Sequence, residues 1–442
     1  MPVARRDRLA LVALAVALFA SYAWFYEAGG WNQNSRFDFV RAVVFRGTMQ
    51  IDAYADNTGD KAVFEGHTYS DKAPGLSLTA IPIVKLAVPL VKRLGMKAQG
   101  PDGLVALSYV ATVVCSGLVT VWAALLLVRA GHDWFGLESA GWFAALVYGL
   151  GTPAWAYATL FMGHALTATL LFVAYLEAWR ISPVDAPSIA RRRGLAVGLA
   201  CGWATVTDMT TAIPAVVLTL FALRHVGTIG VRGVRPAAIG VAVGALACIA
   251  VLVGYNLAAF GSPLHIGYAS EEGFGELKSG FFGITYPKWS VIGELLAGQF
   301  RGLLPLSPVL VGVPLGWWAW WQRRSDRTAF AVAVSLPLYY LLLNSSYFYW
   351  EGGWSYGPRQ MAPALPFFAL ALASAWAAAP RAARGLLALL AATSVALTLI
   401  GVSVTPQPPA MYQRPMAELW WPAFLEGDLS VNHTSFDMRG WN

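Results

Sequence analysis

The chain of 442 residues is strongly apolar: 57% of its residues are hydrophobic, 12% are charged, and its mean hydropathy is +0.54. Soluble domains carry roughly 25% charged residues, so this composition excludes an ordinary soluble protein. Many apolar runs reach the roughly 18 residues needed to cross a bilayer core. The sequence therefore predicts an all-α polytopic membrane protein.

The net charge of +7 predicts membrane topology and not nucleic-acid binding. Basic residues mark the cytoplasmic loops of membrane proteins. When the apolar runs are placed alternately across the membrane, sixteen arginines and no lysine fall on one side, and all seven lysines fall on the other. Because the arginine-rich side is the expected cytoplasmic side, we predict a multi-pass plasma (inner) membrane protein. Its N-terminus is expected in the cytoplasm and its C-terminus outside.

About eleven transmembrane helices are predicted. The first run follows several arginines, as in a signal peptide, but it is long for one and no cleavage site follows, so it is predicted to be an uncleaved span. The cytoplasmic connections are short and no Walker-type motif is present, which disfavours an ATP-driven transporter. The predicted spans are residues 9–26, 103–128, 140–160, 163–181, 194–206, 210–223, 237–260, 303–321, 328–347, 361–379 and 385–404.

Two interfacial helices are predicted in the first extracytoplasmic loop, residues 27–100. Residues 35–46 place apolar side chains near one helical face and charged ones toward the other, as in a helix that lies on a membrane surface. Residues 76–91 are apolar but contain Lys85, which is costly at mid-bilayer. They are therefore predicted to be interfacial or half-inserted.

The rest of the chain follows the same plan. A further surface helix is expected near residues 291–300, within a second large outer loop, residues 261–301. Residues 1–404 are thus predicted to form one transmembrane domain, and residues 405–442 an extracytoplasmic tail. The polar outer segments are expected to meet around one cavity at the outer membrane surface.

The first loop concentrates the charged residues of a chain that has few. Its carboxylates up to residue 74 are Glu27, Asp38, Asp52, Asp56, Asp60, Glu65 and Asp71. At its end, Asp71 and Lys72 precede Pro74 and Gly75, where a helix is expected to begin. A lysine beside a helix N-terminus suits an anion, because free amide donors add to its charge, and phosphate is the predicted ligand. The alternative is an exposed ion pair in an ordinary turn.

Arg359 lies in a glycine- and aromatic-rich segment just before a predicted span. A guanidinium can bind a phosphate through two parallel donors, and glycines let the backbone approach a ligand closely. The alternative is a group of interfacial aromatic residues with an arginine that extends toward the membrane surface.

His164 and Asp208 are ionisable residues at the ends of predicted spans. His164 is a candidate to bind phosphate or a substrate hydroxyl, with a structural histidine as the alternative. Asp208 separates two short spans, where an ionisable residue is costly unless it is used. Its alternative role is that of a helix cap.

No metal site is predicted. The cysteines all lie in apolar runs without metal-binding spacing, so neither a disulfide nor a zinc site is expected. Asp56, Asn57 and Asp60 lie near Gly59, but their spacing is not that of a calcium-binding EF-hand loop. A divalent cation remains possible as a cofactor, without a clear site.

The order of motifs in about the first hundred residues resembles the GT-C superfamily of polyprenyl-phosphate-sugar glycosyltransferases. Its members include the bacterial aminoarabinose transferase of lipid A and protein O-mannosyltransferases. The family has a Ser-Arg-aromatic surface helix ending near a Gly-Asp/Thr step, followed by Gly-x-x-Tyr-x-x-Lys-Pro-Pro-Leu. The residues that carry the resemblance are Ser35-Arg36-Phe37, Gly47-Thr48 and Gly66-His67-Thr68-Tyr69-Ser70-Asp71-Lys72-Ala73-Pro74-Gly75-Leu76.

The resemblance implies a GT-C-like transmembrane domain and a phosphate-binding role for Lys72, which takes the place of the motif lysine. Asp71 takes the place of the acidic residue before it. Arg36, His67 and Tyr69 belong to the same motifs and are predicted to contribute to substrate binding.

The general base is less clear from the sequence. The family's catalytic aspartate usually stands just before the Ser-Arg pair, where this chain has Asn32-Gln33-Asn34. Transfer needs a base to take the acceptor's proton. Asp52 and Asp38 are the predicted candidates, unless the amides mark a different chemistry or lost activity.

The predicted function is transfer of a sugar from a polyprenyl-phosphate donor to an extracytoplasmic lipid, glycan or protein acceptor in the cell envelope. The expected partners are this donor and membrane lipids, without nucleic acid. Two alternatives stay open. One is a transporter or flippase of a lipid-linked saccharide, and the other is a non-catalytic membrane protein of envelope assembly.

Overall fold

The computed structural model of the protein describes residues 5–224, 234–271, 275, 280–323 and 326–429. Within them the chain is mainly helical, with one two-stranded sheet. Two apolar helices, Arg8–Trp24 and Met209–Ala222, are shorter than a typical span, and six segments are long and apolar enough to cross a membrane. The fold class is therefore the predicted all-α polytopic one. The six segments are Gly75–Arg93, Pro101–Phe135, Arg235–Phe260, Arg327–Ser346, Arg359–Ala378 and Arg381–Val404.

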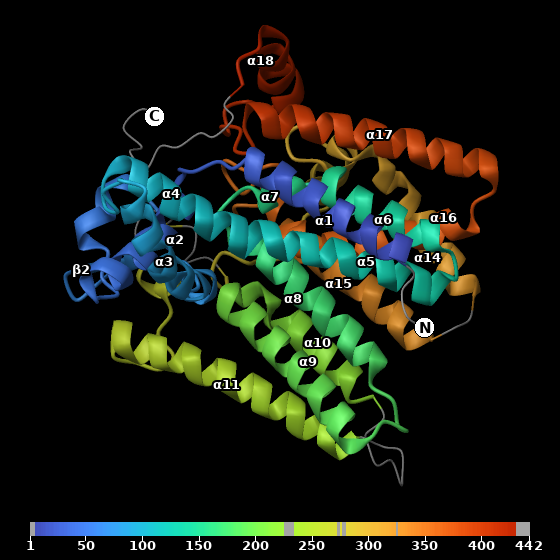
Figure 1. The fold of residues 1–442 in the computed structure, drawn as a ribbon, viewed down its shortest axis with the longest axis horizontal. Helices are drawn as coiled ribbons and strands as arrows, with labels where there is room; N and C mark the ends of the chain where they lie inside the picture. The colour runs from blue at the N-terminus through green and yellow to red at the C-terminus, as the bar shows by residue number, and fades with distance from the viewer. Residues whose placement is uncertain (1–4, 225–233, 272–274, 276–279, 324–325, 430–442) are drawn as a thin grey trace.

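Long helices lie side by side and form the body of the molecule (Figure 1). In chain order they are α1 (Arg5–Trp24), α4 (Pro101–Thr112), α5 (Val119–Phe135), α6 (Glu138–Leu150), α8 (Gly163–Arg180), α9 (Pro187–Thr207), α10 (Ala212–Ala222), α11 (Val234–Phe260), α14 (Val313–Gln322), α15 (Arg327–Ser346), α16 (Leu365–Ala378) and α17 (Arg381–Val404). The π-helical turn η3 (Val113–Leu118) joins α4 to α5. Each predicted span overlaps one or more helices of this body.

The helices α1, α15 and α17 begin at the end of the body opposite to α2 and β2 (Figure 1). Helices α15 and α17 each begin with an arginine, so these arginines lie at the end of the body away from the first loop. Parts of the predicted connections, loop 261–301 and tail 405–442 lie outside the described residues: 225–233, 272–274, 276–279, 324–325 and 430–442.

Helices α9 and α11 pack backbone against backbone. A Cβ added to Gly194 would lie 2.1 Å from the carbonyl oxygen of Ala237, and one added to Gly240 would lie 2.2 Å from that of Arg191. Small residues let membrane helices approach this closely, and the resulting dispersion contacts stabilise the pair. The pair carries Asp208 at the C-terminal end of α9.

The first loop folds into a compact unit at one end of the body. Helix α2 (Trp31–Arg41) continues into the π-helical turn η1 (Ala42–Arg46), where the sequence predicts a helix over residues 35–46. It begins earlier than predicted, and its polar residues, including Arg36 and Asp38, are buried under the rest of the loop. Those side chains therefore make contacts within the protein.

A β-hairpin, which the sequence pattern did not predict, follows the turn η2 (Asp52–Asn57). Strand β1 (Lys61–Phe64) pairs antiparallel with β2 (His67–Ser70), with Lys61 opposite Ser70. Glu65 and Gly66 form the connection, and both have positive φ, which matches the twist of a tight hairpin.

Helix α3 (Gly75–Arg93) starts directly after this hairpin and continues through Pro82 and Pro89. Lys85 is exposed on it. Its length and apolar composition are sufficient for a membrane span. Its interfacial placement stays a prediction.

The remaining short elements line the same end or connect the long helices. They are η4 (Met209–Thr211), η5 (Gly267–Ser270), η7 (Pro308–Gly312), η8 (Arg359–Ala364), η9 (Met416–Trp420), α7 (Ala154–Ala158), α12 (Trp289–Ala297), α13 (Leu303–Leu306) and α18 (Trp421–Glu426). Helix α12 lies where a surface helix was predicted. The start of the tail packs on the body, since the buried Trp420 donates a hydrogen bond to the carbonyl of Thr405.

Candidate functional site

Lys72 lies at the centre of a buried group of charges at the open end of the hairpin. Its Nζ is 2.9 Å from Asp60 and 2.6 Å from Asp71. The three residues are each at most 8% exposed. The register explains the arrangement: Lys61 pairs with Ser70, so the next pair outward is Asp60 and Asp71. The chain then turns at Pro74 into α3, which fixes Lys72 between them.

Lys72 and its carboxylate neighbours act strongly on one another. Burial alone lowers the pKa of Lys72, but Asp60 and Asp71 outweigh it and raise that pKa above its ordinary value. Burial raises the pKa of Asp71, and Lys72 opposes this rise. An isolated buried charge costs several kcal/mol, so each of these groups depends on the others. A ligand that displaces a carboxylate from Lys72 must therefore bring a negative charge of its own.

Arg36 brings a second cation to this group from α2. Its guanidinium donates to the carbonyl of Ala73 at 3.1 Å and to the Asn32 side chain at 3.1 Å. Burial lowers the pKa of Arg36, while Asp208 and Asp71 act in the opposite direction. Arg36 is therefore close enough to both carboxylates to feel their field.

Serine hydroxyls hold α2, the hairpin and α3 together around these charges. Ser35 and Ser70 share a hydrogen bond of 2.7 Å, and Ser35 also donates to Asp71 at 3.4 Å. Ser77 donates to the carbonyl of Arg36 at 2.9 Å. All are buried, so the group is positioned by a satisfied network and not by packing alone.

Two glycines bring distant segments against the group. A Cβ on Gly75 would lie 2.4 Å from the hydroxyl oxygen of Thr207, and one on Gly267 would lie 2.8 Å from the carbonyl oxygen of Asp71. The end of α9 and the turn η5 can approach only because these Cβ atoms are absent. Tyr268 in η5 then places its ring centroid 5.6 Å from Lys72 Nζ.

His164 and Arg359 face the same region. A Cβ on Gly163, the residue before His164, would lie 3.8 Å from the guanidinium of Arg36. Tyr347 interacts electrostatically with both Arg359 and Lys72. Within the described residues, buried His164 Nδ1 and Arg359 Nε have no hydrogen-bond partner. Such atoms lose their hydration without replacement, which suits a site completed by a ligand.

Asp208 takes the predicted role of a helix cap, and its role in a site stays a prediction. Its carboxylate accepts from the backbone N–H of Thr210 at 3.0 Å and from the Thr210 hydroxyl at 2.8 Å, so it caps the turn η4. It also acts electrostatically on Arg36.

The two predicted base candidates lie outside the Lys72 group. Asp38 is buried in an ion pair of 2.8 Å with Arg41, and burial raises its pKa to about 7 against the opposing effect of Arg41. Asp52 accepts from His67 at 3.0 Å and from the N–H of Thr68 at 2.6 Å. These hydrogen bonds outweigh its slight burial and lower its pKa. His67 is thereby held at the closed end of the hairpin.

Tyr69, in contrast, lies inside the loop. Its hydroxyl is 3.4 Å from Gln50, which donates to it, and its ring lies 5.1 Å from that of Phe260. Its contacts are those of a core residue.

Amides stand where the sequence resemblance leads one to expect an acidic residue. Gln33 accepts from the N–H of Phe161 at 2.6 Å and donates to the carbonyl of Gly29 at 2.5 Å. Asn34 donates to the carbonyl of Asn57 at 2.8 Å. These side chains connect α2 to its surroundings.

Asp60, which contacts Lys72 together with Asp71, is a candidate in the sequence only for a cation site. A hairpin turn at Glu65-Gly66 was the signal that could have placed it opposite Asp71. Within the described ranges, no group of three or more His, Cys, Asp or Glu side chains is arranged to hold a metal ion.

Comparison with known structures finds similar folds at low sequence identity. The crystal structure of ArnT from Cupriavidus metallidurans bound to undecaprenyl phosphate matches with a TM-score of 0.58 and 16% identity, over 96% of this chain and 70% of that one. The apo ArnT of the same organism matches with a TM-score of 0.53 and 16% identity, over 86% and 61%. No protein-family model and no curated protein matches the sequence. The chain therefore shares the overall fold of ArnT, an outcome that agrees with the fold expected from the motifs in the first hundred residues.

Proposed function

We propose that this protein transfers a sugar from a polyprenyl-phosphate donor to an extracytoplasmic lipid, glycan or protein acceptor. The observation that carries the proposal is a pair of buried cations, Lys72 and Arg36, with Arg359 nearby. The bound undecaprenyl phosphate of the similarly folded ArnT supports this class of lipid.

The donor's phosphate would displace the carboxylates of Asp60 and Asp71 from the ammonium group of Lys72. Its oxygens compete for Nζ, and Arg36 and Arg359 add donors whose planar geometry suits phosphate. As the bond between the anomeric carbon and the phosphate oxygen breaks, the leaving polyprenyl phosphate gains negative charge. Fixed cations in a site shielded from water stabilise that charge in the transition state.

For the base, the geometry favours Asp60 over Asp38 and Asp52. Asp60 is 2.9 Å from Lys72 Nζ, whereas the other two are engaged with Arg41 and His67. When phosphate takes Lys72, the Asp60 carboxylate loses its cation and becomes more basic. It can then accept the acceptor's hydroxyl proton while the hydroxyl oxygen bonds to the anomeric carbon.

The variant Lys72→Ala tests the phosphate role. We expect the rate of sugar transfer from undecaprenyl-phosphate sugars to fall about 100-fold or more, as on removal of one charged transition-state donor. Lys85→Ala, an exposed lysine on α3, is the matched control and keeps its activity. Because Lys72→Ala leaves two buried carboxylates unpaired, Asp71→Asn/Lys72→Met serves as a second variant that removes charge of both signs. Full transfer activity in both variants would contradict the proposal.

A second candidate function is a flippase or transporter of a lipid-linked saccharide. The observation in its favour is that Gln33 and Asn34 stand at the family's acidic position and serve structural contacts. Product formation by the detergent-purified protein decides between the two, since no transport can be scored in detergent. Binding of undecaprenyl phosphate without any product would favour the transporter.

A further inference from the structure

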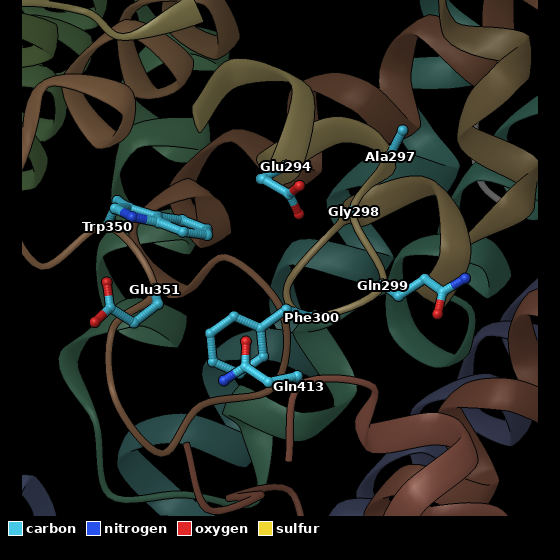
Figure 2. A pocket seen from close by; sticks show the side chains of 8 residues that line it. All are labelled: Glu294, Ala297, Gly298, Gln299, Phe300, Trp350, Glu351 and Gln413. Atoms are coloured by element: carbon cyan, nitrogen blue, oxygen red, sulfur yellow. The ribbon is translucent and has the colours of Figure 1, made fainter. Parts of the chain in front are cut away.

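A polar cleft with a volume of about 700 Å³ opens beside the loop that contacts Arg359. Figure 2 shows its lining, which comes from the end of α12 with the loop after it, from the loop after α15, and from the start of the tail. The lining residues are Glu294, Ala297, Gly298, Gln299, Phe300, Trp350, Glu351 and Gln413. None of them is among the residues predicted to carry function. A volume of this size accommodates a small oligosaccharide or a comparable ligand.

The lining combines carboxylates with aromatic rings. Glu294 and the ring of Trp350 extend toward the space between the segments, whereas the Glu351 carboxylate lies at its edge and points outward (Figure 2). Of the two carboxylates, Glu351 interacts electrostatically with Arg301, which is buried behind the lining. Carboxylates accept hydrogen bonds from hydroxyl or ammonium groups, and indole and phenyl rings provide flat apolar faces. Sugars present hydroxyls at their edges and C–H groups on their faces.

The cleft is held in shape by a buried arginine. Arg301 is fully buried and donates to the backbone carbonyls of Glu351 at 3.2 Å and Gly353 at 2.6 Å. Its guanidinium also lies 4.1 Å from the ring centroid of Phe300. The loop of Glu351 and the ring of Phe300 are therefore fixed relative to each other, so a ligand meets a preformed site.

The same loop connects the cleft to the cationic site. A Cβ on Gly352 would lie 2.9 Å from Cδ of Arg359, so the Arg359 side chain packs directly behind the residue next to Glu351. One face of this loop thus lines the acidic cleft, and Arg359 approaches the region of Lys72 from the other. A transferase needs two substrates to meet at such a boundary.

We propose that this cleft binds the saccharide part of the acceptor, and that this part carries no anionic group. The assignment of the bound saccharide as acceptor rests on the proposed transfer reaction, but the site itself follows from the cleft. The lining contains two carboxylates and no basic side chain, so it repels phosphate, sulfate or uronate and accepts neutral or amine-bearing sugars. This separates it from the cationic site for the donor phosphate.

The test uses three trisaccharides of similar size with the full-length protein in detergent: neutral chitotriose, cationic glucosamine trimer and anionic galacturonate trimer. Isothermal titration calorimetry should show binding of the neutral or the cationic trimer at least tenfold tighter than of the anionic one. Which of the two binds better tells whether an amine is recognised. Equal or tighter binding of the anionic trimer, or no binding of any, would overturn the proposal.

Variants assign the binding to this cleft. Glu294→Gln/Glu351→Gln should weaken binding of the preferred trimer about tenfold or more, because each carboxylate gives a charge-assisted hydrogen bond. Trp350→Ala should weaken it similarly, and Glu65→Gln at the exposed hairpin turn is the matched control. Unchanged affinity in the double variant would place the binding elsewhere and refute the assignment.

Binding of undecaprenyl phosphate, measured alongside the trimers, distinguishes a failure of the saccharide cleft from a failure of the donor site. Undecaprenyl phosphate should bind the double glutamate variant as it binds the unmodified protein and should bind Lys72→Ala weakly. If the trimers bind as expected but Lys72→Ala does not change binding of undecaprenyl phosphate, the donor site is wrong and the saccharide cleft stands. If instead Lys72→Ala weakens binding of undecaprenyl phosphate but the trimers do not bind as expected, the saccharide cleft is refuted and the donor site stands.

Discussion

The two ends of one hairpin carry similar ion pairs in opposite surroundings. At the closed end, Asp52 and His67 are 3.0 Å apart with side chains 44% and 50% exposed. At the open end, Asp60, Asp71 and Lys72 are joined at 2.6–2.9 Å and are buried. Exposed pairs contribute roughly 0–1 kcal/mol, whereas breaking a buried pair costs about 3–5 kcal/mol. Charges that are kept buried at such a cost are the better candidates for function.

The largest expected effect is on catalysis, in Asp60→Asn. If Asp60 takes the acceptor's proton, its loss should lower the turnover rate about 100-fold or more. Undecaprenyl phosphate should still bind, because Lys72 keeps Asp71 as a partner. Steady-state kinetics and lipid-binding measurements on the same preparation check this. Asp52→Asn is the matched control at the other end of the hairpin. An equal loss of rate in Asp52→Asn would contradict the assignment of Asp60, and not Asp52, as the base.

Glu27 extends the comparison to a buried carboxylate whose partners are neutral. It accepts from Thr405 at 3.0 Å and from Gln407 at 3.1 Å, and burial raises its pKa to about 8. Between about pH 4.5 and 8 the folded state therefore binds more protons than the unfolded state, so stability falls as pH rises through this window. Glu27→Gln, which mimics the protonated acid, should remove this dependence.

At pH 8 the free energy of unfolding of Glu27→Gln should exceed that of the unmodified protein by roughly 3 kcal/mol. Near pH 5 the two free energies should differ little. Denaturant unfolding of the detergent-purified protein at several pH values measures it. An identical pH dependence in Glu27→Gln and the unmodified protein would show that Glu27 is already ionised in the fold.

The smallest expected effect is that of Asp52→Ala. It removes a half-exposed pair with His67 and one hydrogen bond from the N–H of Thr68, so the free energy of unfolding should fall by only about 1 kcal/mol. Sugar transfer should be unaffected. A large loss of transfer without loss of stability would instead support Asp52 as the base.

Much of this arrangement was predictable because it depends on local sequence. The apolar runs gave the long helices, and Pro74 with Gly75 indicated the helix start that positions Lys72. The Ser-Arg motif placed Arg36 on α2, where it reaches the carbonyl of Ala73. Each of these features depends on residues that are near in the sequence or on a repeated pattern.

The rest depends on contacts between distant segments. Asp60 faces Asp71 only because an unexpected hairpin forms, and Tyr268 arrives from a loop nearly two hundred residues away. The sequence made Asp38 a candidate base, but in the folded protein its carboxylate forms an ion pair with Arg41. The order of carboxylates along the loop therefore could not indicate which one lies next to the lysine.

The most direct test of the central claim is the affinity for undecaprenyl phosphate, measured on the unmodified protein, Lys72→Ala and Asp71→Asn/Lys72→Met. We expect both variants to bind at least tenfold more weakly, since each loses a charge-assisted contact to the phosphate. Lys85→Ala should bind like the unmodified protein. Equal affinity in all four proteins would contradict a phosphate site at Lys72.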